Sequence, residues 1–274
     1  MISFSIIIPT SNRPSLLKLC LSELYKAVTY IGSHKVEIIV TDDSSDERSK
    51  DLLKTHFPQV RFMNGPRKGP AANRNNGAKS ASGQWLLFLD DDIIPDVNLI
   101  SDYINAISLD IEIAAFEGAI FPDDWKLLEK DMAECPINTY GGCFWSANVC
   151  IKKELFFKIG GFNEQYTIAA QEDQDIFAKI KVHTPVPFLK NAFVIHPVRI
   201  ASLKKKIQLA PSSIINWLIF QQKTKSLASC FEIGYKSQIS ALVDNVKKMK
   251  PKSSIYNMYI IFIFPFVVLR SKIN

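Results

Sequence analysis

Cysteine is sparse in this chain, and its placement is informative. The 274 residues include five cysteines, an odd number without any Cys-x-x-Cys pair, and they are Cys20, Cys135, Cys143, Cys150 and Cys230. This spacing indicates neither a disulfide framework nor a thiolate zinc site. We therefore expect a protein of a reducing compartment, the cytoplasm.

Targeting and phosphate-loop signals are also missing. Residues 1–4 lead directly into the apolar Ser5–Ile8, with no basic region, long apolar core or small-residue cleavage site, so no secretion signal is expected. The first apolar run is not followed by Gly-x-Gly-x-x-Gly, and no Gly-Lys-Ser/Thr loop occurs. A nucleotide, if bound, must be held by other groups.

Acidic residues are almost absent from the last part of the chain. The overall net charge is +6, but residues 1–198 carry 20 Lys+Arg against 25 Asp+Glu, and residues 199–274 carry 13 against 2. With 47% hydrophobic residues, the length suits one large domain, residues 1–198, and a basic C-terminal extension, residues 199–274. Such a basic tail indicates nucleic acid or an anionic membrane surface as a partner.

Short apolar runs alternate with helical patterns over residues 1–198. The predicted strands are residues 4–9, 36–41, 60–63, 85–89, 113–120, 149–151 and 188–195, and the predicted helices are residues 14–28, 47–57, 70–83, 97–108, 153–159 and 171–180. This order predicts an α/β fold with a mostly parallel central sheet, right-handed crossovers and flanking helices.

The run Trp85–Asp92 is the most informative stretch. Five large apolar residues predict a strand buried on both faces, and three carboxylates follow it directly. Ligands collect at the carboxyl ends of strands in open α/β sheets, and a divalent cation would relieve the repulsion between adjacent carboxylates. The alternative is a solvated acidic turn.

Several motifs occur in an order typical of one enzyme family. They are Pro9–Arg13, Asp42–Asp46, Ala72–Gly77, Asp90–Asp92, Gly160–Glu164 and Glu172–Asp175. Together they make residues 1–198 resemble a family-2 inverting glycosyltransferase of the GT-A fold. The resemblance implies transfer of a sugar from a nucleoside-diphosphate sugar to a saccharide or lipid-linked acceptor.

The resemblance also implies the donor site. It assigns nucleotide binding to Pro9, Thr10, Arg13, Asp43, Arg74, Asp90 and Asp91. A carboxylate at Asp43 can accept a hydrogen bond from the imide N–H of uracil, which favours a UDP-sugar. Asp90 and Asp92 match the outer acids of an Asp-x-Asp motif that holds Mn²⁺ or Mg²⁺. His196 matches a further metal ligand of some relatives, although a lone His before Pro is also an ordinary loop residue.

The chemistry of inversion requires a base that takes the proton of the acceptor hydroxyl. The resemblance assigns this role to Asp173, with Glu172 beside it, and Asp175 could contact acceptor hydroxyls. Trp145 could stack on an acceptor sugar, or belong to the core. One departure is Lys179, which stands where the family pattern has arginine, and lysine cannot make a bidentate phosphate contact.

The C-terminal extension combines basic clusters with apolar, aromatic segments. Ile255–Leu269 is an apolar run of 15 residues containing Pro265, whereas about 20 residues span a bilayer. We expect a mainly helical extension that is an interfacial anchor or packs on the catalytic domain, with peripheral contact to the inner face of the membrane. Nucleic acid is disfavoured, because no nucleic-acid motif accompanies the charge.

Two other functions compete with sugar transfer. A sugar-phosphate nucleotidyltransferase also combines an α/β sheet with a carboxylate-bound metal, but its usual glycine-rich loop after the first strand is missing. The second is a non-catalytic nucleotide-sugar or membrane-binding homologue. The intact Glu172–Asp173 pair and the acidic triad argue against it.

Overall fold

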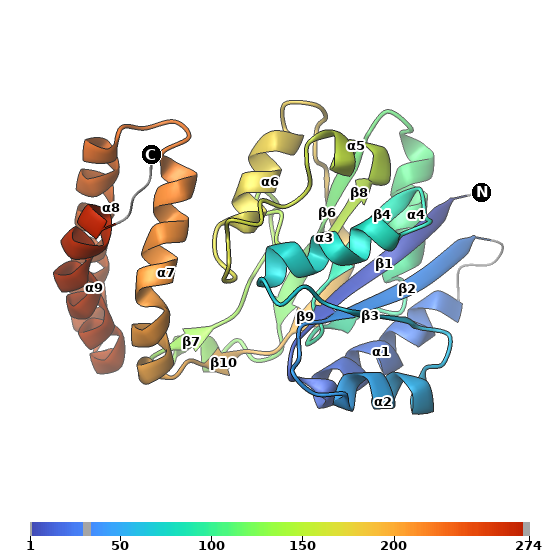
Figure 1. Ribbon diagram of the computed structural model, residues 1–274, viewed down its shortest axis with the longest axis horizontal. Coiled ribbons are helices and arrows are strands. Elements are labelled where there is room, and N and C mark those ends of the chain that lie inside the picture. The colour runs from blue at the N-terminus through green and yellow to red at the C-terminus, as the bar shows by residue number, and fades with distance from the viewer. Residues whose placement is uncertain (1, 30–33, 271–274) are drawn as a thin grey trace. The chain divides into compact units, whose positions relative to one another are not determined.

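The computed structural model describes residues 2–29 and 34–270, which form two compact units (Figure 1). The first comprises residues up to Asp123 together with Pro136–Pro197, and we call it the sheet unit. The second comprises Asp124–Cys135 and the chain from Val198 onward, and we call it the helical unit. Each unit therefore contains two separate stretches of the sequence.

The sheet unit is built on one mixed sheet. Its strands are β1 (Ser3–Thr10), β2 (Lys35–Asp42), β3 (Arg61–Asn64), β4 (Trp85–Leu89), β5 (Ile94–Pro95), β6 (Ala115–Pro122), β8 (Asn148–Lys152) and β9 (Phe188–His196), in the order β3-β2-β1-β4-β8-β6-β9-β5. Strands β3, β2, β1 and β4 are parallel, as are β6 and β9, whereas β8 is antiparallel to both β4 and β6. The predicted fold class, α/β with a mostly parallel sheet, is confirmed.

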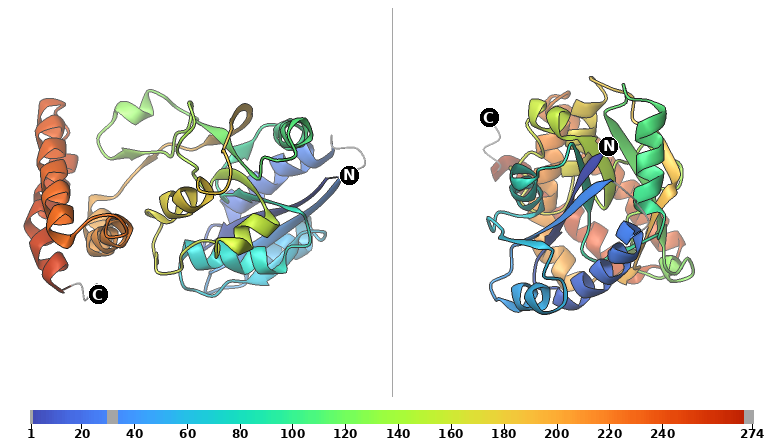
Figure 2. Two further views of the ribbon diagram at one scale, coloured as in Figure 1. Left: turned by 90° about the horizontal axis from the view of Figure 1, so that it is seen from above. Right: turned by 90° about the vertical axis from the view of Figure 1, so that its right-hand side faces the viewer.

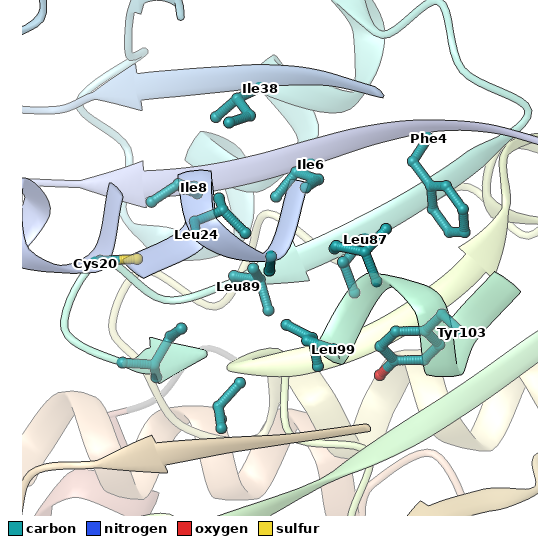
Figure 3. Close-up of a cluster of buried hydrophobic side chains, with 14 of the residues drawn as sticks. Phe4, Ile6, Ile8, Cys20, Leu24, Ile38, Leu87, Leu89, Leu99 and Tyr103 are labelled. Carbon is teal, nitrogen blue, oxygen red and sulfur yellow. The ribbon is translucent and has the colours of Figure 1, made fainter. Parts of the chain in front are cut away.

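Helices cover both faces of this sheet (Figure 2). Helices α1 (Pro14–Thr29), α2 (Arg48–His56) and α4 (Leu99–Leu109) contribute to one apolar cluster, and α3 (Pro70–Ser80), α5 (Lys153–Lys158) and α6 (Glu172–Ile180) contribute to another. Successive side chains of a strand point to opposite faces, so Ile6 and Ile8 belong to the first cluster and Ile7 to the second. Figure 3 shows Ile6 and Ile8 with Leu87 and Leu89 of β4.

The sheet positions polar groups at one edge. The parallel strands β1, β2 and β4 run in the same direction, so their carboxyl ends bring Thr10, Asp42 and the residues after Leu89 to the same side. This is the edge at which α/β sheets bind ligands.

The helical unit has its own core. It contains α7 (Leu203–Gln221), α8 (Leu227–Lys247) and α9 (Pro251–Arg270), the 3-10 turn Leu127–Glu129, and the antiparallel pair β7 (Ala133–Glu134) and β10 (Arg199–Ile200). The buried residues are Ala210, Ile214, Leu218, Cys230, Ile260, Phe264 and Val268. The C-terminal region is thus helical, as expected.

Two features of the helical unit were not predicted. Part of the segment Asp124–Cys135 pairs with β10, and Asp131 accepts hydrogen bonds from the backbone N–H of Lys252 (2.7 Å) and Ser253 (3.1 Å) at the start of α9. Helix α9 has 20 residues, more than the apolar run, because it begins at Pro251. Its length and composition would allow it to cross a membrane. Of its most apolar 18-residue stretch, 28% is buried within the protein.

The buried centre of the sheet gives a first prediction. Leu87 is fully buried in β4, so Leu87→Ala should lower the free energy of unfolding by about 3–5 kcal/mol through lost transfer energy and a residual cavity. Leu109 is 87% exposed, and Leu109→Ala should change it by less than about 0.5 kcal/mol. Urea unfolding of both variants tests this, and equal losses would contradict the assigned core.

Candidate functional site

The three carboxylates after β4 are all paired with an arginine, and two of them share the same one. Asp91 is buried, accepts from Thr10 Oγ1 (2.6 Å) and pairs with Arg13 (3.0 Å). Asp92 pairs with Arg13 (3.0 Å) and lies 3.2 Å from His196 Nε2. Arg13, which lies between β1 and α1, therefore offsets the repulsion between these two carboxylates.

Arg74 connects the third carboxylate to a more distant part of the sequence. Its buried guanidinium in α3 contacts Asp90 (2.8 Å) and Glu172 (3.4 Å), so it joins the end of β4 to the start of α6. Burial opposes its charge, but the surrounding Asp90, Asp173 and Glu172 raise the pKa of Arg74. Burial also opposes ionisation of Asp90, and the Arg74 guanidinium outweighs it, so the pKa of Asp90 lies below its ordinary value.

Asp90, Asp92 and His196 form a group suited to a metal ion. One ligand atom from each residue lies within 4.8 Å of the others. His196 Nδ1 faces the carbonyl of Pro197 (3.0 Å), which only accepts, so Nδ1 carries the proton in the neutral ring. The Nε2 lone pair then faces a carboxylate oxygen of Asp92, and this contact favours a cation between them.

The start of α6 carries the candidate base. Glu172 is buried and accepts from the backbone N–H of Ala170 (2.7 Å), and burial raises its pKa. The Oδ1 atom of Asp173 is also buried, and burial with the neighbouring Glu172 raises the pKa of Asp173 to about 7. Ser146 donates to Asp173 from its hydroxyl and backbone N–H, which limits this rise.

The predicted nucleoside contacts lie together at the ends of β1 and β2. Pro9 is buried in β1, and the carbonyl of Thr10 accepts from the backbone N–H of Asp43 (2.9 Å). The Asp43 carboxylate accepts from the backbone N–H of Arg67 (2.8 Å), and burial raises its pKa. Gly65 approaches so closely that an added Cβ would lie 2.1 Å from Asp43 Oδ1. A larger residue at position 65 would displace this carboxylate.

The two residues predicted to contact an acceptor have intramolecular partners. Trp145 is half-buried, packs against the core and donates from Nε1 to the carbonyl of Ile137 (3.2 Å). Asp175 is buried, accepts from Tyr166 (3.5 Å) and pairs with Lys179 (3.3 Å). Lys179 thus has a carboxylate partner on its own helix. Acceptor contact by Trp145 and Asp175 stays a prediction.

Glu117, a buried carboxylate that the sequence did not reveal as important, orders the loop next to the candidate base Asp173. Glu117 in β6 accepts from the backbone N–H groups of Gly142 (2.5 Å), Cys143 (3.1 Å) and Phe144 (2.8 Å), and so fixes the loop that leads to Ser146. An acid inside an otherwise apolar strand was the available signal. Its partners could not be read from the sequence because they lie more than 20 residues away.

Glu117 also lines a surface cleft of about 670 Å³. Other lining residues are Tyr140, Gly141, Phe177, Lys181 and Phe188, and none of the residues assigned above to donor, metal or base lines it. The cleft therefore adjoins the fixed loop rather than the acidic group.

Comparisons with known proteins agree with this geometry. A sequence model described as "Glycosyl transferase family 2" matches residues 5–163. An uncharacterized glycosyltransferase of Haemophilus influenzae is 30% identical over 192 residues, covering 64% of this chain and 61% of that protein. A GalNAc(5)-diNAcBac-PP-undecaprenol beta-1,3-glucosyltransferase of Campylobacter jejuni is 37% identical over 93 residues, covering 32% and 29%. The chain thus spans less than two thirds of either relative's length.

A solved structure has the same fold. The mannosyltransferase from Pyrobaculum calidifontis in complex with GDP-Man and Mn²⁺ superposes with a TM-score of 0.61 and 17% identity, covering 98% of this chain and 87% of that one.

The raised pKa of Asp173 predicts a pH-dependent effect on stability. The folded state binds this proton more tightly than the unfolded state, whose pKa is near 3.8, so ionising Asp173 destabilises the fold as pH rises from about 4 through 7. Asp173→Asn should therefore raise Tm at pH 8, by about 2–4 °C for each kcal/mol added to the free energy of unfolding. This gain in Tm should shrink toward pH 4.

Thermal unfolding at both pH values measures this gain. The exposed Glu112→Gln, in the segment between α4 and β6, is the control and should leave Tm nearly unchanged at either pH. A lower Tm for Asp173→Asn at pH 8 would show that the carboxylate stabilises the fold instead.

Proposed function

Because this chain belongs to glycosyl transferase family 2, we propose that it transfers a sugar from a nucleoside-diphosphate sugar to a saccharide or lipid-linked acceptor, with inversion at the anomeric carbon. The observation that carries the proposal is the double contact of Arg74 with Asp90 (2.8 Å) and Glu172 (3.4 Å). It brings the acidic group after β4 and the acids at the start of α6 into one site. A donor phosphate and an attacking hydroxyl require this proximity.

The donor would lie along the carboxyl edge of the sheet. Pro9, Thr10 and Asp43 would contact the nucleoside, and Asp43 would accept from a uracil imide, which favours a UDP-sugar. Arg13 bridges Asp91 and Asp92 and is partly exposed, so it can also face a phosphate. Arg74 contacts the adjacent Asp90, and its cation would offset the charge of the diphosphate.

Asp90, Asp92 and His196 would hold a divalent cation. Two carboxylates and an imidazole suit Mn²⁺ better than Mg²⁺, which prefers oxygen ligands alone. A bound cation would neutralise negative charge that grows on the leaving diphosphate. The Arg74 guanidinium keeps Asp90 ionised, as a metal ligand must be.

Asp173 would act as the general base. A hydroxyl is a weak nucleophile until its proton is removed, and a base with a pKa near the working pH does this well. Burial and the neighbouring Glu172 bring the pKa of Asp173 into that range, and Ser146 donates hydrogen bonds to its carboxylate. The loop fixed by Glu117 would keep Ser146 in place.

The acceptor is the least defined part of the reaction. The relative from Campylobacter jejuni is named for an undecaprenol-diphosphate-linked substrate, which supports a lipid-linked saccharide here. Trp145 and Asp175 remain the proposed acceptor contacts. A lipid-linked acceptor would place the enzyme in the cytoplasm, at the inner face of the membrane.

Product analysis tests the reaction and the metal assignment together. With Mn²⁺ and a panel of nucleotide sugars, the wild-type protein should release a nucleoside diphosphate. Asp92→Asn should weaken Mn²⁺ binding by calorimetry at least about tenfold and abolish turnover, because it removes one charged ligand. Asp51→Asn, on the exposed surface of α2, should behave as the wild type.

Two results would contradict the proposal. Release of pyrophosphate when a nucleoside triphosphate and a sugar 1-phosphate are supplied instead would identify a nucleotidyltransferase. Donor binding without product for any acceptor would favour a non-catalytic homologue.

The pH dependence of the rate tests the base. Because Asp173 must be ionised to accept a proton, kcat/KM should fall about tenfold per pH unit below about 7 and level off above it. Ser146→Ala removes a donor that favours the ionised carboxylate, so the midpoint should move to higher pH. Asp173→Asn should lower kcat about 10²–10⁴-fold at every pH. An unchanged midpoint in Ser146→Ala would exclude Asp173 as the titrating base.

A further inference from the structure

Helix α9 is apolar on two opposite faces. One face, which includes Ile260, Phe264 and Val268, is buried in the core of the helical unit. The opposite face carries Ile255, Met258, Phe262, Phe266 and Leu269, spaced three or four residues apart, and we call these five residues the outer stripe. A helix that is apolar all round is usually enclosed by protein or lipid, yet the outer stripe is 46–83% exposed.

The ends of the outer stripe are basic. Four lysines lie at one end: Lys247 ends α8, Lys248 and Lys250 lie in the turn before α9, and Lys252 is in its first turn. Arg270 ends the helix at the other side. Residues 199–274 carry 13 Lys+Arg against 2 Asp+Glu. The two acids, Glu232 and Asp244, are each paired with a lysine four residues later. An apolar stripe between positive ends complements an anionic lipid surface.

Charge disfavours a second copy of the chain on this face. Two identical stripes meeting across a twofold axis would bring two strongly basic regions together, and like charges across an interface oppose association. Anionic lipid headgroups would instead neutralise the same residues.

The packing of α9 distinguishes lying on a membrane from crossing it. Phe264 contacts Trp217 of α7 (5.9 Å between ring centroids) and Phe231 of α8 (5.7 Å). Asn257 accepts from Asn245 (2.8 Å) and donates to Gln238 (3.0 Å) in α8. A spanning α9 would have to give up these contacts, whereas a surface-bound α9 keeps them.

We propose that the outer stripe docks on an anionic phospholipid bilayer, with α9 lying in the plane of the interface and its inner face still packed on α7 and α8. The stripe would enter the headgroup and acyl boundary while the basic residues at its ends contact lipid phosphates. This interaction is separate from sugar transfer and does not depend on the proposed function.

Vesicle flotation tests the docking surface. The purified full chain should float with vesicles of phosphatidylcholine and phosphatidylglycerol, and at least tenfold less with phosphatidylcholine alone. The double variant Phe262→Glu/Phe266→Glu should reduce flotation at least tenfold. Its matched control is Ile111→Glu/Val182→Glu, at two exposed apolar positions of the sheet unit, which should float as the wild type. Circular dichroism and Tm of both variants should match the wild type.

Several outcomes would overturn the proposal. Wild-type protein that does not float, or a Phe262→Glu/Phe266→Glu variant that floats normally, would exclude the outer stripe as the docking surface. Light scattering that finds a dimer abolished by the same variant would identify a second copy as the occupant. Membrane-bound protein that resists alkaline carbonate extraction would indicate a spanning helix. Donor binding, measured separately by thermal shift, should be equal in all variants.

Discussion

A buried arginine determines how the candidate site is assembled. Arg74 lies in α3, on one face of the sheet, and contacts carboxylates from the end of β4 and from the start of α6. Burying a charge is unfavourable unless it is paired, and removing one partner of a buried pair leaves the other uncompensated. The positions of Asp90 and Glu172 are therefore linked through one guanidinium, although 82 residues separate them in sequence.

The surroundings of Asp90 and Asp173 give these two acids different pKa values. Direct contact with Arg74 holds the pKa of Asp90 low, so this carboxylate stays charged and can bind a cation. Asp173 is half-buried beside the negative Glu172, and desolvation together with this neighbouring charge raises its pKa to about 7. Environments that give two carboxylates different pKa values suit them to different roles. A metal ligand and a proton acceptor can then operate at the same pH.

The sequence predicted the parts of the fold that depend on local pattern. The apolar run Trp85–Leu89 and the acids after it were sufficient to locate β4 and its polar end, because burial and strand period are local properties. The antiparallel direction of β8 was not predicted, since apolar periodicity carries no strand direction. Glu117, Ser146 and the cap formed by Asp131 were missed for a related reason, as their partners come from distant parts of the chain.

The raised pKa of Asp173 and its carboxylate oxygen, unsatisfied within the described part of the chain, together favour a chemical role for this residue over a purely structural one. Networks of structural ion pairs also shift pKa values, so a raised pKa alone does not identify a base. A structural carboxylate, however, is normally satisfied on both oxygens. Within residues 2–29 and 34–270, the buried Oδ1 of Asp173 has no hydrogen-bond partner, while Ser146 donates to this carboxylate. The fold thus retains a carboxylate that is costly to ionise and has an oxygen left for a proton donor, the arrangement that an acceptor hydroxyl would complete.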